Sequence, residues 1–428
     1  MLKACAVQDQ QLTPRAYEYA HPQLSPVLRE TIARLEPVAR ERWPFEPEAL
    51  LRKASDKTGL SDFGDAGFRA ALQVLCESAE EELDLNAIGR RNLHGQILDH
   101  LMQRLRFEDL WKRHPEILQL NIDRPLFIVG LPRSGTTFLQ HLLARDPAMR
   151  VVPFWEQLSP LPEHDAARRP PDDAPLIEQA RKNVEGLRQN APALLQMHQL
   201  AAEDPDEEIY LLAPGFSSMI YEWVYILPRY AEWYARQDHT EGYRYFKRVL
   251  QTLQWLRGGK RWLLKAPQHM EQLKPLLAVF PDATIIETLR DPATAAVSTA
   301  NLTTYGQRLR TDHPDPLATG AAIVGLIQRL VLALLRDRPD GDARFVQVHF
   351  QALMSEPLSA VRRIYAAAGL ELGDEVVARM QAYVEENRGG KHVKNEYSAQ
   401  DFGIDVPALR QSLRQYYQRF GVPEDAKL

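Results

Sequence analysis

One segment constrains this chain more than any other: PLFIVGLPRSGTTFLQHLL, which begins at Pro125. Residues 126–129 form a short apolar run with strand character, and a glycine-containing turn follows them. From Thr137 onward apolar residues return at helical spacing. A strand that turns through glycines into a helix can hold a phosphate on backbone N–H groups and on the helix N-terminus. The segment therefore predicts an anion-binding loop at residues 130–137.

The loop differs from an ATP-binding loop at one position. Gly130 and Gly135 keep the GxxxxG spacing of a Walker A loop, but Thr136 stands where its lysine belongs. That lysine neutralises the β and γ phosphates of a triphosphate. Arg133 supplies a cation at a different point, so Arg133, the Thr136 and Thr137 hydroxyls and the loop amides suit a less charged group. Such a site requires no metal. The alternative is a glycine turn that binds nothing.

Three further apolar runs, at 262–264, 284–289 and 345–348, are predicted to be strands. Helical spacing is found between or after them, at 241–257, 292–303, 321–336 and 355–368. Strands that alternate with helices predict a parallel sheet covered on both faces. Residues 1–120 instead show helical spacing with few β-branched residues. The prediction is an α/β fold, with a helical N-terminal region (1–120) and a sheet-containing domain (121–428).

A second candidate anchor follows the 284–289 strand. Arg290 lies at its carboxyl end, which in an open α/β sheet faces the ligand crevice. Pro292 suits the first turn of a helix, and Ser298 falls about two turns inside it. Arg290 can hold a phosphate with two hydrogen bonds, and Ser298 could add a third. The simpler interpretation is a helix cap or a surface ion pair. With the glycine loop, the pair predicts a ligand that carries two separated phosphates.

The two segments together resemble the PAPS-dependent sulfotransferases. Residues 130–137 match that family's 5′-phosphosulfate loop (PxSGT or PRSGT), and Arg290 and Ser298 match its 3′-phosphate motif. Similarity to the large, mostly bacterial branch covers nearly the whole chain, through TGLSDFG, RHPEI, PFWEQLSPLP, EDPDEE, KAPQH and EYSAQDFGI. The resemblance implies a P-loop α/β fold and 3′-phosphoadenosine 5′-phosphosulfate (PAPS) as donor. It also implies adenosine 3′,5′-bisphosphate (PAP) as product and no metal.

The resemblance also assigns cofactor contacts. They are Arg133, Ser134, Gly135, Thr136, Thr137, Arg290 and Ser298. The better-known cytosolic members have a lysine in the loop, where this chain has Arg133, and a C-terminal Arg-Lys-Gly clamp. The nearest counterpart of that clamp, RGGKH at 388–392, has a different order. Arg388 or Lys391 is therefore a candidate cofactor contact. The alternative is a solvated helix C-terminus with basic residues near its dipole.

The segment RWLLKAPQH supplies candidate catalytic groups. The strand should stop near Pro267, which places Lys265 and His269 at its carboxyl end, on the ligand side. Sulfuryl transfer is an in-line displacement that needs a base for the acceptor proton and a cation for the developing charge. His269 is the candidate general base. Lys265 and Arg133 are the candidates that stabilise the developing negative charge. The alternatives are a capping or packed His269 and an ion-paired Lys265.

A carboxylate is the competing base. The segment HQLAAEDPDEE holds His198 and the acidic residues of 203–208, and some members of the superfamily use a glutamate. Most of such a run is normally a solvated helix start. Glu207 or Glu208 could still face the acceptor or orient His269.

Aromatic residues suggest the kind of acceptor. They gather at 216–225, at Trp233 and Tyr234, and at Phe154 and Trp155. Such side chains line apolar ligand pockets, although they also dominate protein cores. The predicted reaction moves a sulfuryl group from PAPS to a hydroxyl or amine of a small, hydrophobic acceptor, such as a phenol, sterol or lipid alcohol.

Composition narrows the remaining classes. The net charge of −5 argues against a general nucleic-acid binder. No stretch reaches the roughly 18 uninterrupted apolar residues of a membrane span, and the N-terminus lacks the apolar core of a signal peptide. The two cysteines, Cys5 and Cys76, form neither a zinc motif nor a disulfide framework. A cytoplasmic protein without a metal site is expected.

The sequence leaves two other functions open. A P-loop small-molecule kinase or NTPase would need a Walker lysine and a Mg²⁺-binding aspartate, for which Asp291 is a poor candidate. A non-catalytic protein could retain the nucleotide site. Its binding of adenosine 3′,5′-bisphosphate without turnover would separate it from an enzyme.

Overall fold

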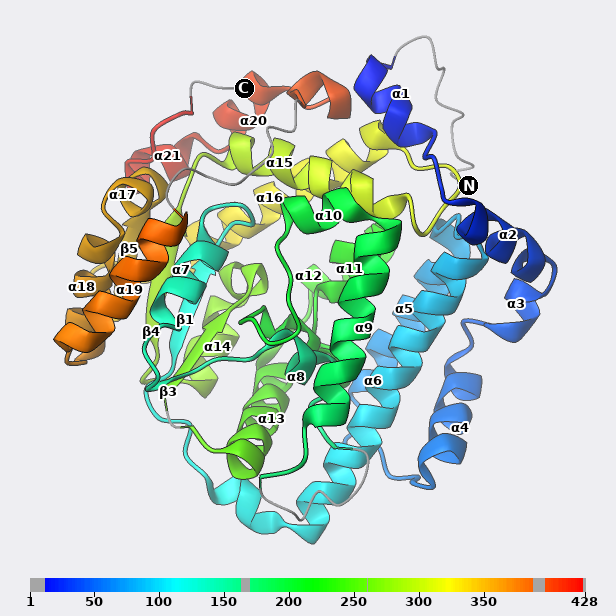
Figure 1. The fold of residues 1–428 in the computed structure, drawn as a ribbon, viewed down its shortest axis with the longest axis horizontal. Helices are drawn as coiled ribbons and strands as arrows, with labels where there is room; N and C mark the ends of the chain where they lie inside the picture. The colour runs from blue at the N-terminus through cyan, green and yellow to red at the C-terminus, as the bar shows by residue number, and fades with distance from the viewer. Residues whose placement is uncertain (1–11, 163–169, 260, 388–396, 426–428) are drawn as a thin grey trace.

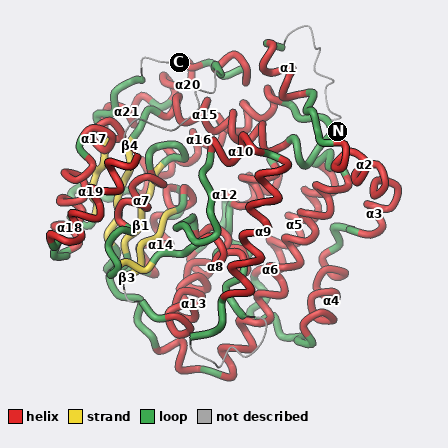
Figure 2. The backbone as a smooth tube through the Cα atoms, in the orientation of Figure 1, coloured by secondary structure: helices red, strands yellow, loops and turns green. Residues whose placement is uncertain are grey.

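The computed structural model describes residues 12–162, 170–259, 261–387 and 397–425. Within them a five-stranded parallel sheet is surrounded by helices (Figures 1 and 2). The strands are β1 (Leu126–Gly130), β2 (Met149–Arg150), β3 (Arg261–Lys265), β4 (Thr284–Leu289) and β5 (Phe345–His349), in the order β2-β3-β1-β4-β5. The predicted fold class, a parallel sheet flanked by helices, is confirmed.

The apolar character of β1 follows from its position between two cores. Leu126 and Ile128 pack on one face of the sheet with α7 (Thr136–Leu143) and α18 (Pro357–Ala368). Phe127 and Val129 pack on the other face, in the large core that also holds the N-terminal helices. Successive strand residues point to opposite faces, so a strand buried on both sides needs an unbroken apolar run.

The N-terminal part of the described chain is helical. Its helices are α1 (Pro14–Ala20), α2 (Pro26–Leu35), α3 (Ala39–Arg42), α4 (Pro47–Thr58), α5 (Phe68–Glu82) and α6 (Ala87–Arg113). Asn86 caps α6 by accepting a hydrogen bond from the Gly89 N–H group. The buried Arg104 of α6 donates hydrogen bonds to the carbonyls of Phe63 and Pro214. The proposed division at 120/121 thus separates a helical part from a sheet-containing part that share one core.

The other helices cover the sheet and extend around its edges (Figure 1). Before β4 they are α8 (Phe154–Leu158), α9 (Ala174–Asn190), α10 (Pro192–Met197), α11 (Ile220–Tyr225), α12 (Pro228–Ala235), α13 (Thr240–Arg257) and α14 (Leu273–Val279). After β4 they are α15 (Pro292–Gln307), α16 (Pro316–Asp337), α17 (Phe350–Ser355), α19 (Asp374–Asn387), α20 (Val406–Ser412) and α21 (Arg414–Phe420). Five 3₁₀ turns that follow α3 are η3 (Pro115–Gln119), η4 (Glu208–Tyr210), η5 (Ala213–Gly215), η6 (Pro267–Met270) and η7 (Ala399–Phe402).

One helix, α16, is long and apolar enough to cross a membrane by length and composition. Half of its most apolar window is buried inside the fold, where Ile327 and Leu330 are fully covered. A core helix of a soluble protein passes the same test, so the finding is weak evidence for a span. Gly320 of this helix lies against η7, where a Cβ would come within 1.9 Å of the Phe402 carbonyl oxygen.

Candidate functional site

The loops that follow β1, β3, β4 and β5 all leave the same edge of the sheet. The strands are parallel, so their carboxyl ends lie together, and the connections that leave the adjacent strands β1 and β4 lead to opposite edges of the sheet, toward β2 and β5, so the strand order reverses between them. Ligands of open α/β sheets bind at such a reversal point. The predicted loop at 130–137 follows β1, Lys265 ends β3, and Arg290 follows β4. The topology therefore brings these three predicted elements to one edge.

The loop requires glycine at Gly130 because β4 passes too close for a side chain. A Cβ there would lie 1.9 Å from Thr288 Oγ1 and 3.0 Å from Ser134 Oγ. The Ser134 and Thr288 hydroxyl oxygens are 2.7 Å apart, and the Ser134 side chain is fully buried. The Ser134 side chain thus fixes the loop to the neighbouring strand, and its predicted contact with the cofactor stays a prediction.

The loop ends in a free helix start. Gly135, with φ of 87°, precedes α7, and no side chain caps that helix among the described residues. The first N–H groups of an α-helix have no partner within the helix, and the helix dipole adds a partial positive charge. Together with the Thr137 hydroxyl, these groups fit an anionic phosphate or phosphosulfate group.

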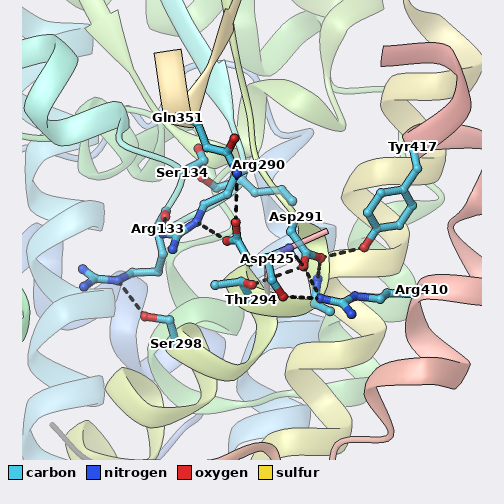
Figure 3. Close-up of polar contacts among 12 residues, drawn as sticks. Arg133, Ser134, Arg290, Asp291, Thr294, Ser298, Gln351, Arg410, Tyr417 and Asp425 are labelled. Carbon is cyan, nitrogen blue, oxygen red and sulfur yellow. Dashed lines mark hydrogen bonds and ion pairs between the residues drawn. The ribbon is translucent and has the colours of Figure 1, made fainter. Parts of the chain in front are cut away.

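Arg133 lies in the loop with a φ of 65° and sends its side chain toward α15 (Figure 3). Its Nε donates to Ser298 Oγ at 3.2 Å, and its Nη1 donates to the Met197 carbonyl at 2.8 Å. Burial lowers the pKa of Arg133, although an arginine stays charged. The structure thus pairs Ser298 with Arg133, whereas the sequence motif had paired it with Arg290.

Arg290 lies next to Arg133 (Figure 3). It donates from Nη1 to the Arg133 carbonyl oxygen, and its guanidinium carbon lies 4.0 Å from the centre of the Phe350 ring. Its Nε lies 3.4 Å from Asp425 Oδ2. Arg290, Phe350 and Asp425 line a cavity of about 220 Å³. Two arginines and a cavity at the carboxyl ends of β4 and β5 form a site that suits a second phosphate.

Asp291 has a structural role. Its Oδ1 accepts from the Ala293 N–H at 2.9 Å and from the Tyr417 hydroxyl at 2.6 Å, while its Oδ2 accepts from Arg410 at 2.6 Å. Burial works to raise the pKa of Asp291, but the hydrogen bonds from Tyr417 and Arg410 outweigh it, so this pKa lies below its ordinary value. Both carboxylate oxygens of Asp291 accept hydrogen bonds from protein groups. Asp291 is therefore not available as the Mg²⁺ ligand that a kinase would need.

Lys265 links the glycine loop to the acidic segment. Its Nζ lies 2.7 Å from Glu207 Oε1 and 3.4 Å from Thr137 Oγ1. The Lys265 side chain is fully buried, whereas the Glu207 side chain keeps 23% exposure. Lys265 is therefore a buried cation beside Thr137 in the first turn of α7, and the carboxylate next to it is partly exposed. Arg133 reaches the other side of the loop, toward Ser298, which favours a binding role for it.

His269 occupies a closed network one turn beyond Lys265. Its Nε2 lies 2.6 Å from Glu208 Oε1, and its Nδ1 lies 2.6 Å from the Tyr243 hydroxyl. Both His269 and Glu208 are fully buried, and the other Glu208 oxygen accepts the Lys265 N–H at 2.7 Å. Burial, reinforced by the charge of Glu208, raises the pKa of Tyr243 well above its ordinary value. With both ring nitrogens engaged, this geometry favours a positioning role for His269 over the predicted role of base.

The remaining predicted residues are placed as follows. Arg388 and Lys391 lie outside the described residues, so their contact with the cofactor stays a prediction. Of the aromatic group, Tyr221 and Tyr234 belong to the large core, and Trp155 belongs to a small separate core. Core packing explains these three, and their predicted lining of an acceptor pocket gains no support. Within the described ranges, no group of three or more His, Cys, Asp or Glu side chains is arranged to share a metal ion.

A larger groove of about 890 Å³ lies between α14 and α16. Glu271, Lys274 and Arg329 are among its lining residues, and none of the predicted site residues is. Of the predicted site residues, Arg290 lines the smaller cavity at the carboxyl ends of β4 and β5.

Comparison with known proteins identifies the family. The sequence model of the sulfotransferase family matches residues 125–374, which is more than half of the chain. The chain belongs to the sulfotransferase family. The match begins one residue before β1 and includes the glycine loop, Lys265, Arg290 and β5. This agrees with the resemblance that the two phosphate motifs indicate.

Solved structures of mycobacterial sulfotransferases share the fold. STF1 from Mycobacterium tuberculosis H37Rv is 30% identical, with a TM-score of 0.73, over 86% of this chain and 98% of that one. STF9 from Mycobacterium avium is 28% identical, with a TM-score of 0.78, over 88% and 97%. The omega-hydroxy-beta-dihydromenaquinone-9 sulfotransferase Stf3 of M. tuberculosis is 25% identical over 72% of this chain and 78% of its own length. The similarity thus includes much of the N-terminal helical part.

Three residues that contact the site residues carry no sequence motif of their own. Phe350 follows β5 in a segment without a motif, and Tyr243 lies in an ordinary amphipathic helix. Asp425 contacts Arg290 across a separation of 135 residues. The phenylalanine could have been suspected from its position at the carboxyl end of a predicted strand.

Proposed function

We propose that this sulfotransferase moves a sulfuryl group from PAPS to the hydroxyl group of a hydrophobic acceptor, with Glu207 as the general base. The observation that carries the proposal is the contact chain from Thr137 through Lys265 to Glu207, which places a cation and a partly exposed carboxylate beside the uncapped start of α7. A reaction that removes a proton from one substrate and develops charge on the other needs both groups.

The residues fit a nucleotide that is anionic at both ends. The free N–H groups of α7 and the Thr137 hydroxyl suit the 5′ end, and Arg290 with the Arg133–Ser298 pair suits a 3′-phosphate. The loop backbone can lie close to β4 only because residue 130 is a glycine, since a Cβ there would have no room. The absence of a Walker lysine and the committed oxygens of Asp291 favour this donor over ATP with Mg²⁺.

When bound, PAPS would supply an activated sulfuryl group whose bond to phosphate breaks as the acceptor oxygen forms its bond to sulfur. Glu207 would take the proton of the acceptor hydroxyl, since its carboxylate keeps some exposure. Lys265 would donate a hydrogen bond toward the charge that develops near Thr137. Glu208 would hold Lys265 by its backbone N–H and His269 by its ring.

The hydrophobic acceptor is supported by one relative. Stf3 carries a menaquinone derivative in its name, and its similarity covers 72% of this chain. We extend from this only the chemical class, a hydroxyl on an apolar molecule. A cytoplasmic location remains part of the proposal, since a chain with two cysteines fits a reducing compartment.

Calorimetric titration tests the donor. Wild-type protein should bind adenosine 3′,5′-bisphosphate, should bind ATP more weakly, and should need no Mg²⁺. Arg290→Ala should weaken bisphosphate binding by about tenfold or more, because a charged hydrogen bond to phosphate contributes about 1.5–3 kcal/mol. Transfer of label from PAPS to a panel of phenols, sterols and lipid alcohols then tests catalysis. Mg²⁺-dependent ATP turnover would contradict the proposal, and bisphosphate binding without any transfer would favour the non-catalytic alternative.

A further inference from the structure

Residues 421–425 follow α21 and supply part of the lining of the cavity beside Arg290. Figure 3 shows Asp425 of this segment next to Arg290 and Asp291. The backbone of this 421–425 segment is held firmly. The Asp425 N–H donates to Asp291 Oδ2 at 3.0 Å, and the Asp425 carbonyl accepts from Arg410 Nη2 at 2.9 Å. Arg410 and Asp291 are themselves joined at 2.6 Å. A short polar network therefore fixes where the Asp425 side chain can reach.

The Asp425 carboxylate itself is held loosely. Its Oδ2 lies 3.4 Å from Arg290 Nε, and its Oδ1 lies 3.5 Å from Gln351 Nε2. Both distances are at the long limit of hydrogen bonding, whereas the Arg410–Asp291 contact is short. The side chains of Arg290 and Asp425 keep 20% and 21% exposure. Water and a competing anion can therefore reach this ion pair, so its strength is that of a screened, partly exposed contact.

The carboxylate also faces the cavity of about 220 Å³. Val422, Pro423 and Asp425 contribute to its lining from the 421–425 segment. Arg290 and Phe350 contribute from the carboxyl ends of β4 and β5. The cavity thus contains one guanidinium with a carboxylate from a distant part of the chain already beside it. A carboxylate and a phosphate accept hydrogen bonds from the same N–H edges of a guanidinium.

We propose that Asp425 is an internal competitor for the 3′-phosphate at Arg290. The inference rests on the proposed function, which assigns that phosphate to Arg290. A phosphate that binds Arg290 must either displace the Asp425 carboxylate or lie next to its negative charge. Either arrangement weakens nucleotide binding. The apparent affinity of a site equals its intrinsic affinity multiplied by the fraction of molecules in which the site is open. The same contact favours release of the bisphosphate product, because Asp425 can return to Arg290 as the product leaves.

Asp425→Asn tests the inference, because it removes the charge and keeps the shape and the backbone contacts. Glu424→Gln is the matched control, since Glu424 pairs with Arg410 at 3.0 Å and is 62% exposed. The probes are adenosine 3′,5′-bisphosphate and adenosine 5′-monophosphate, which lacks the 3′-phosphate. We expect Asp425→Asn to bind the bisphosphate about two- to fivefold more tightly, the range set by a partly exposed ion pair. Monophosphate affinity should not change, and Glu424→Gln should match wild type with both probes.

Two results would overturn the inference alone. One is wild-type bisphosphate affinity in Asp425→Asn, and the other is an equal gain for the monophosphate, which would indicate a general change of the crevice. If wild-type protein failed to bind the bisphosphate at all, the proposed function and the inference would fall together. The gain in Asp425→Asn should also shrink at high salt, since added ions screen the charge that the substitution removes.

Discussion

Glu207 and Glu208 are adjacent in the sequence, but removing the charge of Glu207 should mainly lower turnover, whereas removing that of Glu208 should mainly lower stability. Glu207→Gln keeps the size of the side chain and an oxygen that can accept from Lys265 Nζ, which now lies 2.7 Å away. It removes the ability to take a proton. Loss of a general base lowers turnover by about 10²- to 10⁴-fold, which corresponds to about 3–5 kcal/mol in the barrier. Bisphosphate binding should change little, because Glu207 is not one of the groups proposed to hold the bisphosphate.

Glu208→Gln is the control, because it makes the same chemical change in a closed site. The carboxylate accepts from His269 Nε2 at 2.6 Å and from the Lys265 N–H at 2.7 Å. A glutamine has only one acceptor oxygen, so one of these buried donors loses its partner. The cost of a buried, unsatisfied polar group is about 1–3 kcal/mol. We therefore expect a lower melting temperature for Glu208→Gln, with a smaller loss of turnover than in Glu207→Gln.

The assay measures sulfated product from labelled PAPS at saturating donor, well below the melting temperature of each variant, with bisphosphate titration as the check on binding. Turnover in Glu207→Gln above about one tenth of wild type would refute the reasoning, because a general base cannot contribute so little. Equal losses in the two variants would also refute it, since Glu207 would then act only through Lys265.

Two further predictions concern buried histidines. His269→Gln should lower the free energy of unfolding by about 1–3 kcal/mol, because one glutamine cannot satisfy both Glu208 and Tyr243. Its turnover below the melting temperature should stay near wild type, and a loss of about a hundredfold would restore His269 as the base. Burial lowers the pKa of His100 to about 3, while its Nδ1 bonds the Tyr221 hydroxyl at 2.6 Å. The pKa of His100 is lower in the folded state than its unfolded value of about 6.5, so the unfolded state takes up a proton first as the pH falls. The contribution of the neutral histidine to the free energy of unfolding therefore decreases below about pH 6.5. Urea unfolding should show that lowering the pH from 7 to 5 costs wild type about 2 kcal/mol more than His100→Gln, and equal losses would contradict this.

The main strands could be predicted because each is an apolar run with an abrupt end. The predictions at 284–289 and 262–264 match β4 and lie within β3, which ends at Lys265, just before Pro267. The two-residue β2, Met149–Arg150, gave no signal, because a strand that short has no periodicity. The strand order depends on contacts between distant segments, and no local pattern contains it.

The candidate site also has parts that the sequence could predict and parts that it could not. The glycine loop and Arg290 were predictable, because a phosphate site at a strand end leaves a local motif. The partners of these residues were not. Ser298 was placed on the correct helix, but its contact with Arg133 depends on how α15 lies against the loop. The sequence offered both His269 and a carboxylate as base, and only burial distinguishes a closed imidazole from the partly exposed Glu207.

The consecutive glutamates explain how one short segment can serve both structure and chemistry. Glu207 has an extended backbone, with φ of −75° and ψ of 134°, and the 3₁₀ turn η4 starts at Glu208. Their side chains therefore diverge, and both reach Lys265, Glu207 at the ammonium group and Glu208 at the backbone N–H. This double attachment fixes the lysine relative to Thr137 and the start of α7. The spacing between the Glu207 carboxylate and the Lys265 ammonium group therefore depends on the backbone conformation at the start of η4.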